Sequence, residues 1–118
     1  MVHDGVSLSA RFAGALVGSA IGDTLGAPLE GSATGSRTVR LRAGRYTDDT
    51  HMMIGVTASL LQCRGLDTEH LAQTLMHRYF EEPWRGYGPG PVRIFREMRE
   101  GRSCHEAARK VYPGGSFG

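Results

Sequence analysis

The sequence predicts an all-α protein built from five helices. Apolar residues recur at the three- and four-residue spacing of a helix in five segments. Serine, threonine or aspartate precedes most of these segments, and glycine or proline follows them, as at natural helix ends. With 118 residues and no internal repeat, the chain is expected to form a single helical bundle domain over residues 1–118.

The first helix is predicted over residues 8–24, with Ser7 or Ser9 as its N-cap. Gly26 and Pro28 are expected to end it. Residues 31–46 follow, rich in Gly, Ser, Thr and Arg, and no clear period runs through them. A short strand is one interpretation of this stretch, and we favour a functional loop. Small residues leave one face of the helix nearly bare, at Gly14, Gly18 and Gly22.

The second helix is predicted to begin at Thr47 and to end at Gly65. A threonine N-cap followed by Asp48 and Asp49 suits the free N–H groups and the positive end of the helix dipole. Helical spacing places Asp49 at the end of the expected buried stripe. That stripe continues through Met53, Val56 and Leu60.

Three shorter helices complete the prediction. Asp67 is expected to cap a third helix that ends before Pro83, and a fourth is expected over residues 92–99. Ser103 and Glu106 have the spacing of a capping box, which predicts a fifth helix to about residue 111.

Composition excludes several classes of protein. The net charge of +2 is too small for a surface that binds nucleic acid. Cys63 and Cys104 lie too far apart in sequence for a CxxC metal or redox motif. Arg11 and several glycines and serines interrupt the apolar run of residues 8–21, so we expect neither a signal peptide nor a membrane span. A cytoplasmic location follows as the default expectation.

The strongest local motif is Thr47-Asp48-Asp49-Thr50. Two adjacent carboxylates with flanking hydroxyls place several hard oxygen donors within one helical turn, and Mg²⁺, Mn²⁺ and Ca²⁺ prefer such donors. An ordinary helix start, with a threonine cap and an acidic first turn, would produce the same pattern. His51 follows directly and is expected to be a surface histidine, because the helix turns it away from Asp49.

Glu30 lies just past the end of the first helix, on backbone made pliable by Gly26 and Gly31. A carboxylate there can point back towards a site, although a solvated loop glutamate is the simpler interpretation. Asp23 is interpreted as structural, binding backbone N–H groups around the turn.

Four motifs taken together carry a resemblance. They are GDTLGAPLE at residues 22–30, YTDDT at 46–50, RGYGPG at 85–90 and GSFG at 115–118. In this order along almost the whole chain, they resemble the ADP-ribosylglycohydrolase family. The resemblance implies a compact all-α bundle and a metal-dependent hydrolase. Such an enzyme cleaves the glycosidic bond between ADP-ribose and a protein side chain.

The resemblance also implies roles for individual residues. Thr47, Asp48 and Asp49 match the N-terminal metal-binding motif of the family, whose complete site holds two Mg²⁺ or Mn²⁺ ions. Glu30 matches a glutamate that reaches the metal centre, so Glu30 and Asp49 are the expected catalytic residues. ADP-ribose or an ADP-ribosylated protein is the expected partner. The loop that meets the diphosphate and the distal ribose corresponds to Gly115, Ser116, Phe117 and Gly118.

One departure from the family pattern is informative. The second metal motif, of DxD[ST] type, is absent, because no two aspartates in this chain are separated by a single residue. We therefore expect the chain to be the N-terminal portion of such a domain, with a C-terminal half missing or supplied by a companion. Apolar helix faces should then be exposed. The alternative is a catalytically inactive fragment or pseudoenzyme.

Overall fold

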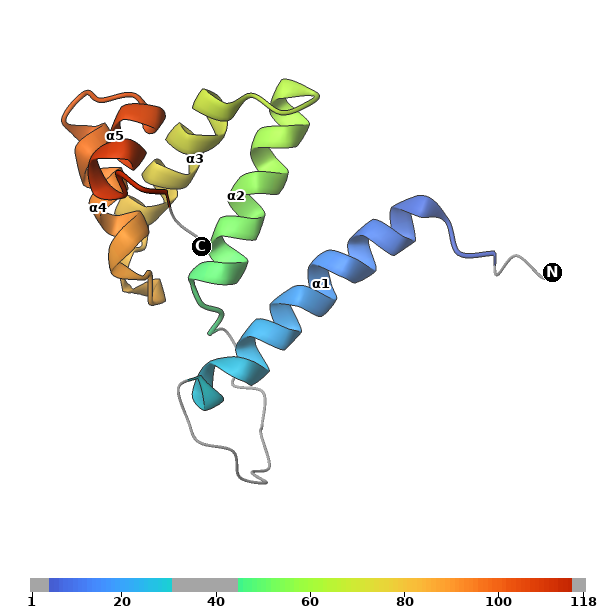
Figure 1. Ribbon diagram of the computed structural model, residues 1–118. Helices are drawn as coiled ribbons and strands as arrows, with labels where there is room; N and C mark the ends of the chain where they lie inside the picture. The colour runs from blue at the N-terminus through green and yellow to red at the C-terminus, as the bar shows by residue number, and fades with distance from the viewer. Residues whose placement is uncertain (1–4, 31–44, 116–118) are drawn as a thin grey trace. The chain divides into compact units, whose positions relative to one another are not determined.

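The structure is a computed structural model that describes residues 5–30 and 45–115 (Figure 1). These residues contain five α-helices, two 3₁₀ turns and no strand, which confirms the predicted all-α class. The chain divides into two compact units, Met1–Thr50 and His51–Gly118, and each is described by itself. The elements are α1 (Leu8–Gly26), η1 (Ala27–Leu29), α2 (Asp48–Cys63), α3 (Thr68–Glu81), η2 (Pro83–Arg85), α4 (Pro89–Arg99) and α5 (Cys104–Val111).

In the first unit, α1 begins and ends close to the predicted positions. Its N-cap is Ser7, whose hydroxyl accepts a hydrogen bond from the Ala10 N–H at 3.1 Å. The helix runs directly into η1, where Pro28 occupies the first turn. Proline suits that position because the N–H it lacks has no partner in the first turn. The loop expected over residues 31–46 lies mostly outside the described residues.

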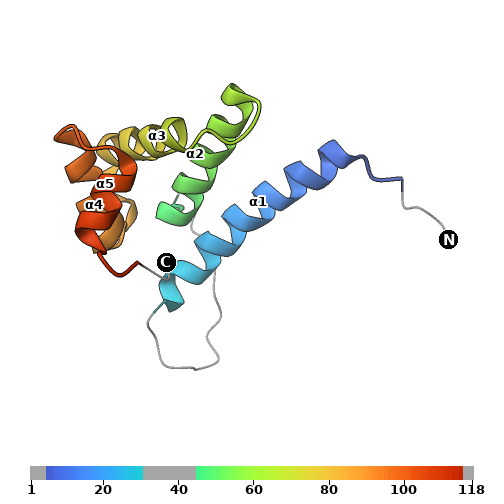
Figure 2. The same cartoon turned by 45° about the horizontal axis from the view of Figure 1, so that its top comes forward.

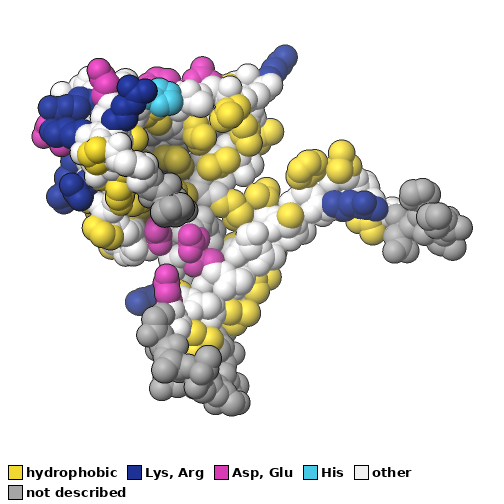
Figure 3. Space-filling view, in the orientation of Figure 1, with side chains coloured by type: hydrophobic (Ala, Val, Ile, Leu, Met, Phe, Trp, Pro, Cys, Tyr) yellow, Lys and Arg dark blue, Asp and Glu magenta, His cyan; other side chains and the backbone are white. Residues whose placement is uncertain are grey.

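α1 presents its apolar side chains to solvent. None of its 19 residues, all in the described part of the chain, is buried, and Phe12 and Val17 are 64% and 59% exposed. Figure 3 shows hydrophobic side chains along this helix. The exposure agrees with the expected unpartnered apolar face. By length and a mean hydropathy of 1.2, residues Leu8–Leu29 also meet the requirement for a membrane-crossing helix, as core helices of water-soluble proteins can. The expected absence of a span therefore stays a prediction.

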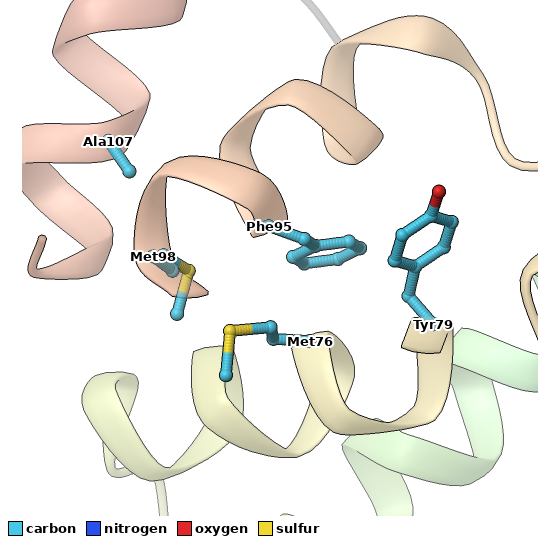
Figure 4. Close-up of a cluster of buried hydrophobic side chains, with 5 residues drawn as sticks. All are labelled: Met76, Tyr79, Phe95, Met98 and Ala107. Atoms are coloured by element: carbon cyan, nitrogen blue, oxygen red, sulfur yellow. The ribbon is translucent and has the colours of Figure 1, made fainter. Parts of the chain in front are cut away.

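The core of the second unit lies where three helices meet (Figure 4). Two views show α3, α4 and α5 side by side (Figures 1 and 2). The aromatic rings of Tyr79 and Phe95 lie 5.6 Å apart, centroid to centroid, at the centre of the cluster. Such apolar burial is the main source of stability for a small helical unit. The buried residues of this core cluster are Met76, Tyr79, Phe95, Met98 and Ala107.

The buried face of α2 differs from the predicted stripe. Leu60 is 41% exposed, whereas Gly55 and Ser59 are buried. A methyl group added at Gly55 would lie 2.8 Å from the Leu75 side chain, so a larger residue here would require the side chains of α3 to shift. The contact surface, or seam, between α2 and α3 is therefore formed by small residues of α2. The hydrophobic spacing of the sequence did not predict this contact surface.

A polar contact completes this seam. The Ser59 hydroxyl lies 2.8 Å from Nδ1 of His70 on α3. Because Ser59 is fully buried, its hydroxyl needs the imidazole as a hydrogen-bond partner.

The remaining helix starts follow their sequence signals. Asp67 caps α3 by accepting from the His70 N–H at 2.9 Å, and Ser103 and Glu106 form the predicted capping box of α5. α4 begins at Pro89, three residues before the predicted start, because proline is well suited to the first helical position after Gly88.

Candidate metal centre

The first turn of α2 is bound by a side chain of α1. One carboxylate oxygen of Asp23, Oδ2, accepts hydrogen bonds from the Thr47 N–H at 2.8 Å and the Thr50 N–H at 3.3 Å. The Thr50 hydroxyl donates to the same oxygen at 2.6 Å. The other oxygen, Oδ1, accepts a hydrogen bond from the Thr47 hydroxyl. Asp23 therefore holds the start of a helix that lies 24 or more residues further along the chain.

This arrangement changes the expected role of Thr47. The sequence predicted a threonine N-cap, whose hydroxyl oxygen accepts from a helix N–H. Instead the Thr47 hydroxyl donates, and the carboxylate of Asp23 accepts from the free N–H groups. Asp23 does bind backbone N–H groups as expected, although they belong to α2 and not to its own turn. Burial alone would raise the pKa of Asp23, but the hydrogen bonds from Thr47 and Thr50 outweigh it and hold the pKa below its usual value.

Asp48 and Asp49 stand beside this hydrogen-bonded group. Asp48 is half-buried, and burial raises its pKa. The negative charge of Asp49 raises it further, with smaller contributions from Glu30 and Asp23. Within the described ranges, no salt bridge neutralises Asp48, Asp49 or Glu30. A bound cation would relieve this repulsion between like charges.

Glu30 lies close to the acidic pair. It directly follows η1, and its side chain lines a pocket of about 370 Å³ together with Asp23 and Asp49. The structure thus brings together the predicted Glu30 and Asp49, which are separated in sequence by the long loop. The pocket is lined by Gly22, Asp23, Gly26, Ala27, Leu29, Glu30 and Asp49.

The donor set fits a divalent cation in chemical type. Carboxylate and hydroxyl oxygens are the ligands of Mg²⁺, which keeps several waters and needs only one or two carboxylates from the protein. In number the donors are few: among residues 5–30 and 45–115, no group of three or more His, Cys, Asp or Glu side chains could hold an ion. The described residues therefore offer part of a coordination shell.

The flanking hydroxyl of Thr50 does not belong to this donor set. Thr50 is buried, with 3% of its surface exposed, so its hydroxyl oxygen is not accessible to a cation. Of the two hydroxyls in the motif, the half-buried Thr47 is therefore the more accessible one.

His51 is buried, with 2% of its surface exposed, so the prediction of a surface histidine was wrong. Its Nδ1 lies 2.8 Å from the Tyr87 hydroxyl, and its Nε2 lies 3.7 Å from Glu82. Burial lowers the pKa of His51, although Glu82 acts in the opposite direction. The RGYGPG turn is thus attached to the beginning of α2 through Tyr87, while the preceding Trp84 is 71% exposed.

Only the first residue of the expected ligand loop is described. Gly115 has a φ of 87°, a left-handed conformation that favours glycine. It lines a pocket of about 510 Å³ in the second unit, and Ser116, Phe117 and Gly118 lie outside the described residues. The other lining residues are Pro91, Ile94, Ala108, Arg109, Tyr112 and Pro113.

Sequence reasoning located the acidic pair and Glu30 but missed the connection between α1 and α2. The sequence contained part of the signal for this connection. Asp23 lies near the end of an apolar helix, where a carboxylate needs hydrogen-bond donors. Which donors it meets depends on the tertiary fold, because Thr47 and Thr50 lie beyond the long loop.

The described residues form an all-α protein in which Glu30 and Asp49 line one pocket. The sequence profile of the ADP-ribosylglycohydrolase family matches residues 4–118. The ADP-ribosylhydrolase ARH3 of Danio rerio is 35% identical, over 96% of this chain and 35% of its own length. The chain belongs to the ADP-ribosylglycohydrolase family.

Two further relatives show the same pattern. ADP-ribosylhydrolase ARH3 of Xenopus tropicalis is 33% identical, over 100% of this chain and 37% of its own length. The Homo sapiens protein of the same name is 33% identical, over 92% of this chain and 36% of its own length. The chain therefore spans about a third of the length of the curated relatives it matches.

Proposed function

We propose that this chain forms one wall of the active site of an ADP-ribosyl hydrolase. In this proposal, Thr47, Asp48, Asp49 and Glu30 hold Mg²⁺ or Mn²⁺, and the substrate carries ADP-ribose on a protein side chain. Family membership and the names of the relatives support the reaction class.

The observation that carries the proposal is the shared pocket of Glu30 and Asp49. These two carboxylates come from segments on either side of the long loop, and no helix-capping requirement would bring Glu30 there. Asp48 adjoins this pocket in sequence, and the negative charges of Asp49, Glu30 and Asp23 add to burial in raising its pKa; a bound cation would relieve that repulsion.

Each residue has a distinct role in the proposed reaction. When bound, a divalent cation would orient the vicinal hydroxyls of the distal ribose and stabilise developing negative charge. Asp48 and Asp49 supply carboxylate oxygens and the Thr47 hydroxyl supplies a neutral oxygen. Glu30, which is exposed and lines the pocket, would in addition accept a proton from the attacking water.

We assign the diphosphate to the loop that begins at Gly115. Gly115 has a left-handed φ of 87°, a conformation that occurs in glycine-rich turns whose backbone N–H groups bind phosphate oxygens. The same loop is expected to contact the distal ribose through Ser116, Phe117 and Gly118.

The test is the release of ADP-ribose from ADP-ribosylated peptides by the whole protein. We expect Asp48→Asn combined with Asp49→Asn to lower the rate by on the order of 100-fold or more, because the cation would lose its charged ligands. The control is Asp67→Asn, which removes one exposed carboxylate while keeping a good N-cap for α3.

Two outcomes would count against the proposal. Release of ADP-ribose at the unchanged rate by the double variant would exclude the acidic pair from the reaction. Absence of release by the unsubstituted protein from both serine-linked and arginine-linked ADP-ribose would favour the catalytically inactive alternative.

A further inference from the structure

We infer that Asp23 is a positioning residue: its carboxylate fixes the Thr47 hydroxyl as a hydrogen-bond donor and so leaves the oxygen lone pairs of that hydroxyl for a cation. This inference rests on the proposed function, because the cation is the ligand that those lone pairs would bind.

The geometry concentrates four donors on one carboxylate. Two are backbone N–H groups and two are hydroxyls, and all four belong to Thr47 or Thr50. An ordinary cap needs only one such contact, made to one N–H group. The contacts to the hydroxyls are additional, and they determine which way each hydroxyl proton points.

A hydroxyl carries one proton and two lone pairs. At Thr47 the proton is used in the bond to Oδ1 of Asp23, since a carboxylate can only accept. Both lone pairs of the Thr47 oxygen then remain for other partners. A hydroxyl that acted as a normal N-cap would spend a lone pair on a helix N–H instead.

The hydrogen bonds to Asp23 occupy both of its carboxylate oxygens. Oδ2 accepts from the Thr47 N–H, the Thr50 N–H and the Thr50 hydroxyl, and Oδ1 accepts from the Thr47 hydroxyl. Asp23 is therefore the carboxylate of this group that is already satisfied by protein donors.

The substitution Asp23→Asn tests whether the direction of the hydrogen bond to the Thr47 hydroxyl matters for cation binding. The amide oxygen can still accept from N–H groups, but the amide nitrogen must donate towards the Thr47 oxygen. The Thr47 hydroxyl would then lose one lone pair and turn its proton away. We expect the affinity of the full chain for Mn²⁺, titrated by electron paramagnetic resonance, to fall about tenfold or more.

Loss of the Asp23 charge would also weaken cation binding, so Asp23→Asn is repeated in two Thr47 backgrounds. With Thr47→Ser the hydroxyl remains, and we expect the same loss of affinity. With Thr47→Val no hydroxyl is present, and we expect Asp23→Asn to change the Mn²⁺ affinity by less than about twofold. Thr50→Val removes another donor to Asp23 and should leave Mn²⁺ affinity close to that of the unsubstituted chain.

Each outcome decides a separate point. Equal losses in the Thr47→Ser and Thr47→Val backgrounds would show that Asp23 acts only through its charge, which would overturn the inference and leave the proposed function intact. No Mn²⁺ binding by the unsubstituted chain would overturn the proposed metal site together with the inference. Circular dichroism of each variant checks that the helices are retained.

Discussion

Contacts of single side chains distinguish the first turn of α2 from an ordinary helix N-terminus. Thr47 has the sequence of an N-cap, but its hydroxyl donates to Asp23 in place of accepting from the helix. Asp48 and Asp49 have the sequence of an acidic first turn, and the pocket adds Glu30 to them. At this scale, hydrogen-bond direction and the balance of charge separate a candidate ligand set from a simple cap.

Gly90 provides a residue-scale test of packing. A methyl group at this buried position would overlap the Tyr112 hydroxyl and lie 3.0 Å from its Cζ atom. Gly90→Ala must therefore displace Tyr112 from α4, and we expect the free energy of unfolding to fall by about 1–3 kcal/mol. Urea denaturation followed by circular dichroism measures this difference.

The matched control is Gly114→Ala. That position is exposed, and an added methyl group would meet no described atom within 4 Å. We expect a change within about 0.5 kcal/mol for the control. An equally small change for Gly90→Ala would show that Tyr112 does not pack on this glycine.

At the scale of helices and turns, α2 is attached to the RGYGPG turn through His51. The Tyr87 hydroxyl binds the imidazole, while the Tyr87 ring packs edge-on against Tyr79 and Phe95. Tyr87→Phe keeps the ring and removes the hydroxyl from a buried polar contact. We expect a loss of about 1–2 kcal/mol in the free energy of unfolding, measured by urea denaturation. A loss below about 0.3 kcal/mol would contradict this contact.

The same contact predicts a pH dependence. Burial lowers the pKa of His51 in the folded chain below its usual value of 6.5, so the unfolded chain binds more protons in this range. The stabilising contribution is therefore complete above pH 6.5 and is lost as the pH falls from there through the lowered value. We expect the free energy of unfolding to decrease between pH 7.5 and about pH 5.5.

Two variants separate His51 from other titrating groups. His51→Gln should flatten the decrease, whereas His77→Gln, at an exposed position of α3, should leave it unchanged. If His51→Gln has the same pH profile as the unsubstituted chain, another group causes the decrease.

Helix positions were the most predictable elements, and helix faces the least. The cap at Asp67 and the box at Ser103 are local hydrogen bonds within four residues, so sequence contains the whole signal. The buried face of α2 depends on α3, where Gly55 permits close approach and Ser59 meets His70. Hydrophobic spacing carries no information about such small and polar contacts.

At the scale of the whole molecule, α1 exposes several large apolar side chains. Phe12 and Val17 are more than half exposed, and apolar patches of this kind bind other apolar surfaces. We expect the chain to bind the dye ANS, and we expect Phe12→Gln with Val17→Gln to reduce the fluorescence at least about twofold. Ser19→Gln, at a polar position of α1, is the control. Unchanged fluorescence in the double variant would place the apolar surface elsewhere.

In the candidate site too, some features were predictable from the sequence and others required the structure. Thr47, Asp48 and Asp49 are adjacent in sequence, so their proximity was predictable. Glu30 was assigned through the family resemblance, and its place beside Asp49 required the structure. The role of Asp23 emerged only from the hydrogen bonds that cross the long loop.

The most direct test of the central claim is a Mn²⁺ titration of the ¹⁵N-labelled full chain, followed by paramagnetic broadening of amide signals. Binding at the acidic turn would broaden the signals of Thr47, Asp48, Asp49 and Glu30 together at the lowest Mn²⁺ concentrations. Broadening that begins instead at the exposed Glu100 of the second unit, or that never reaches Glu30, would contradict a cation site formed by these residues.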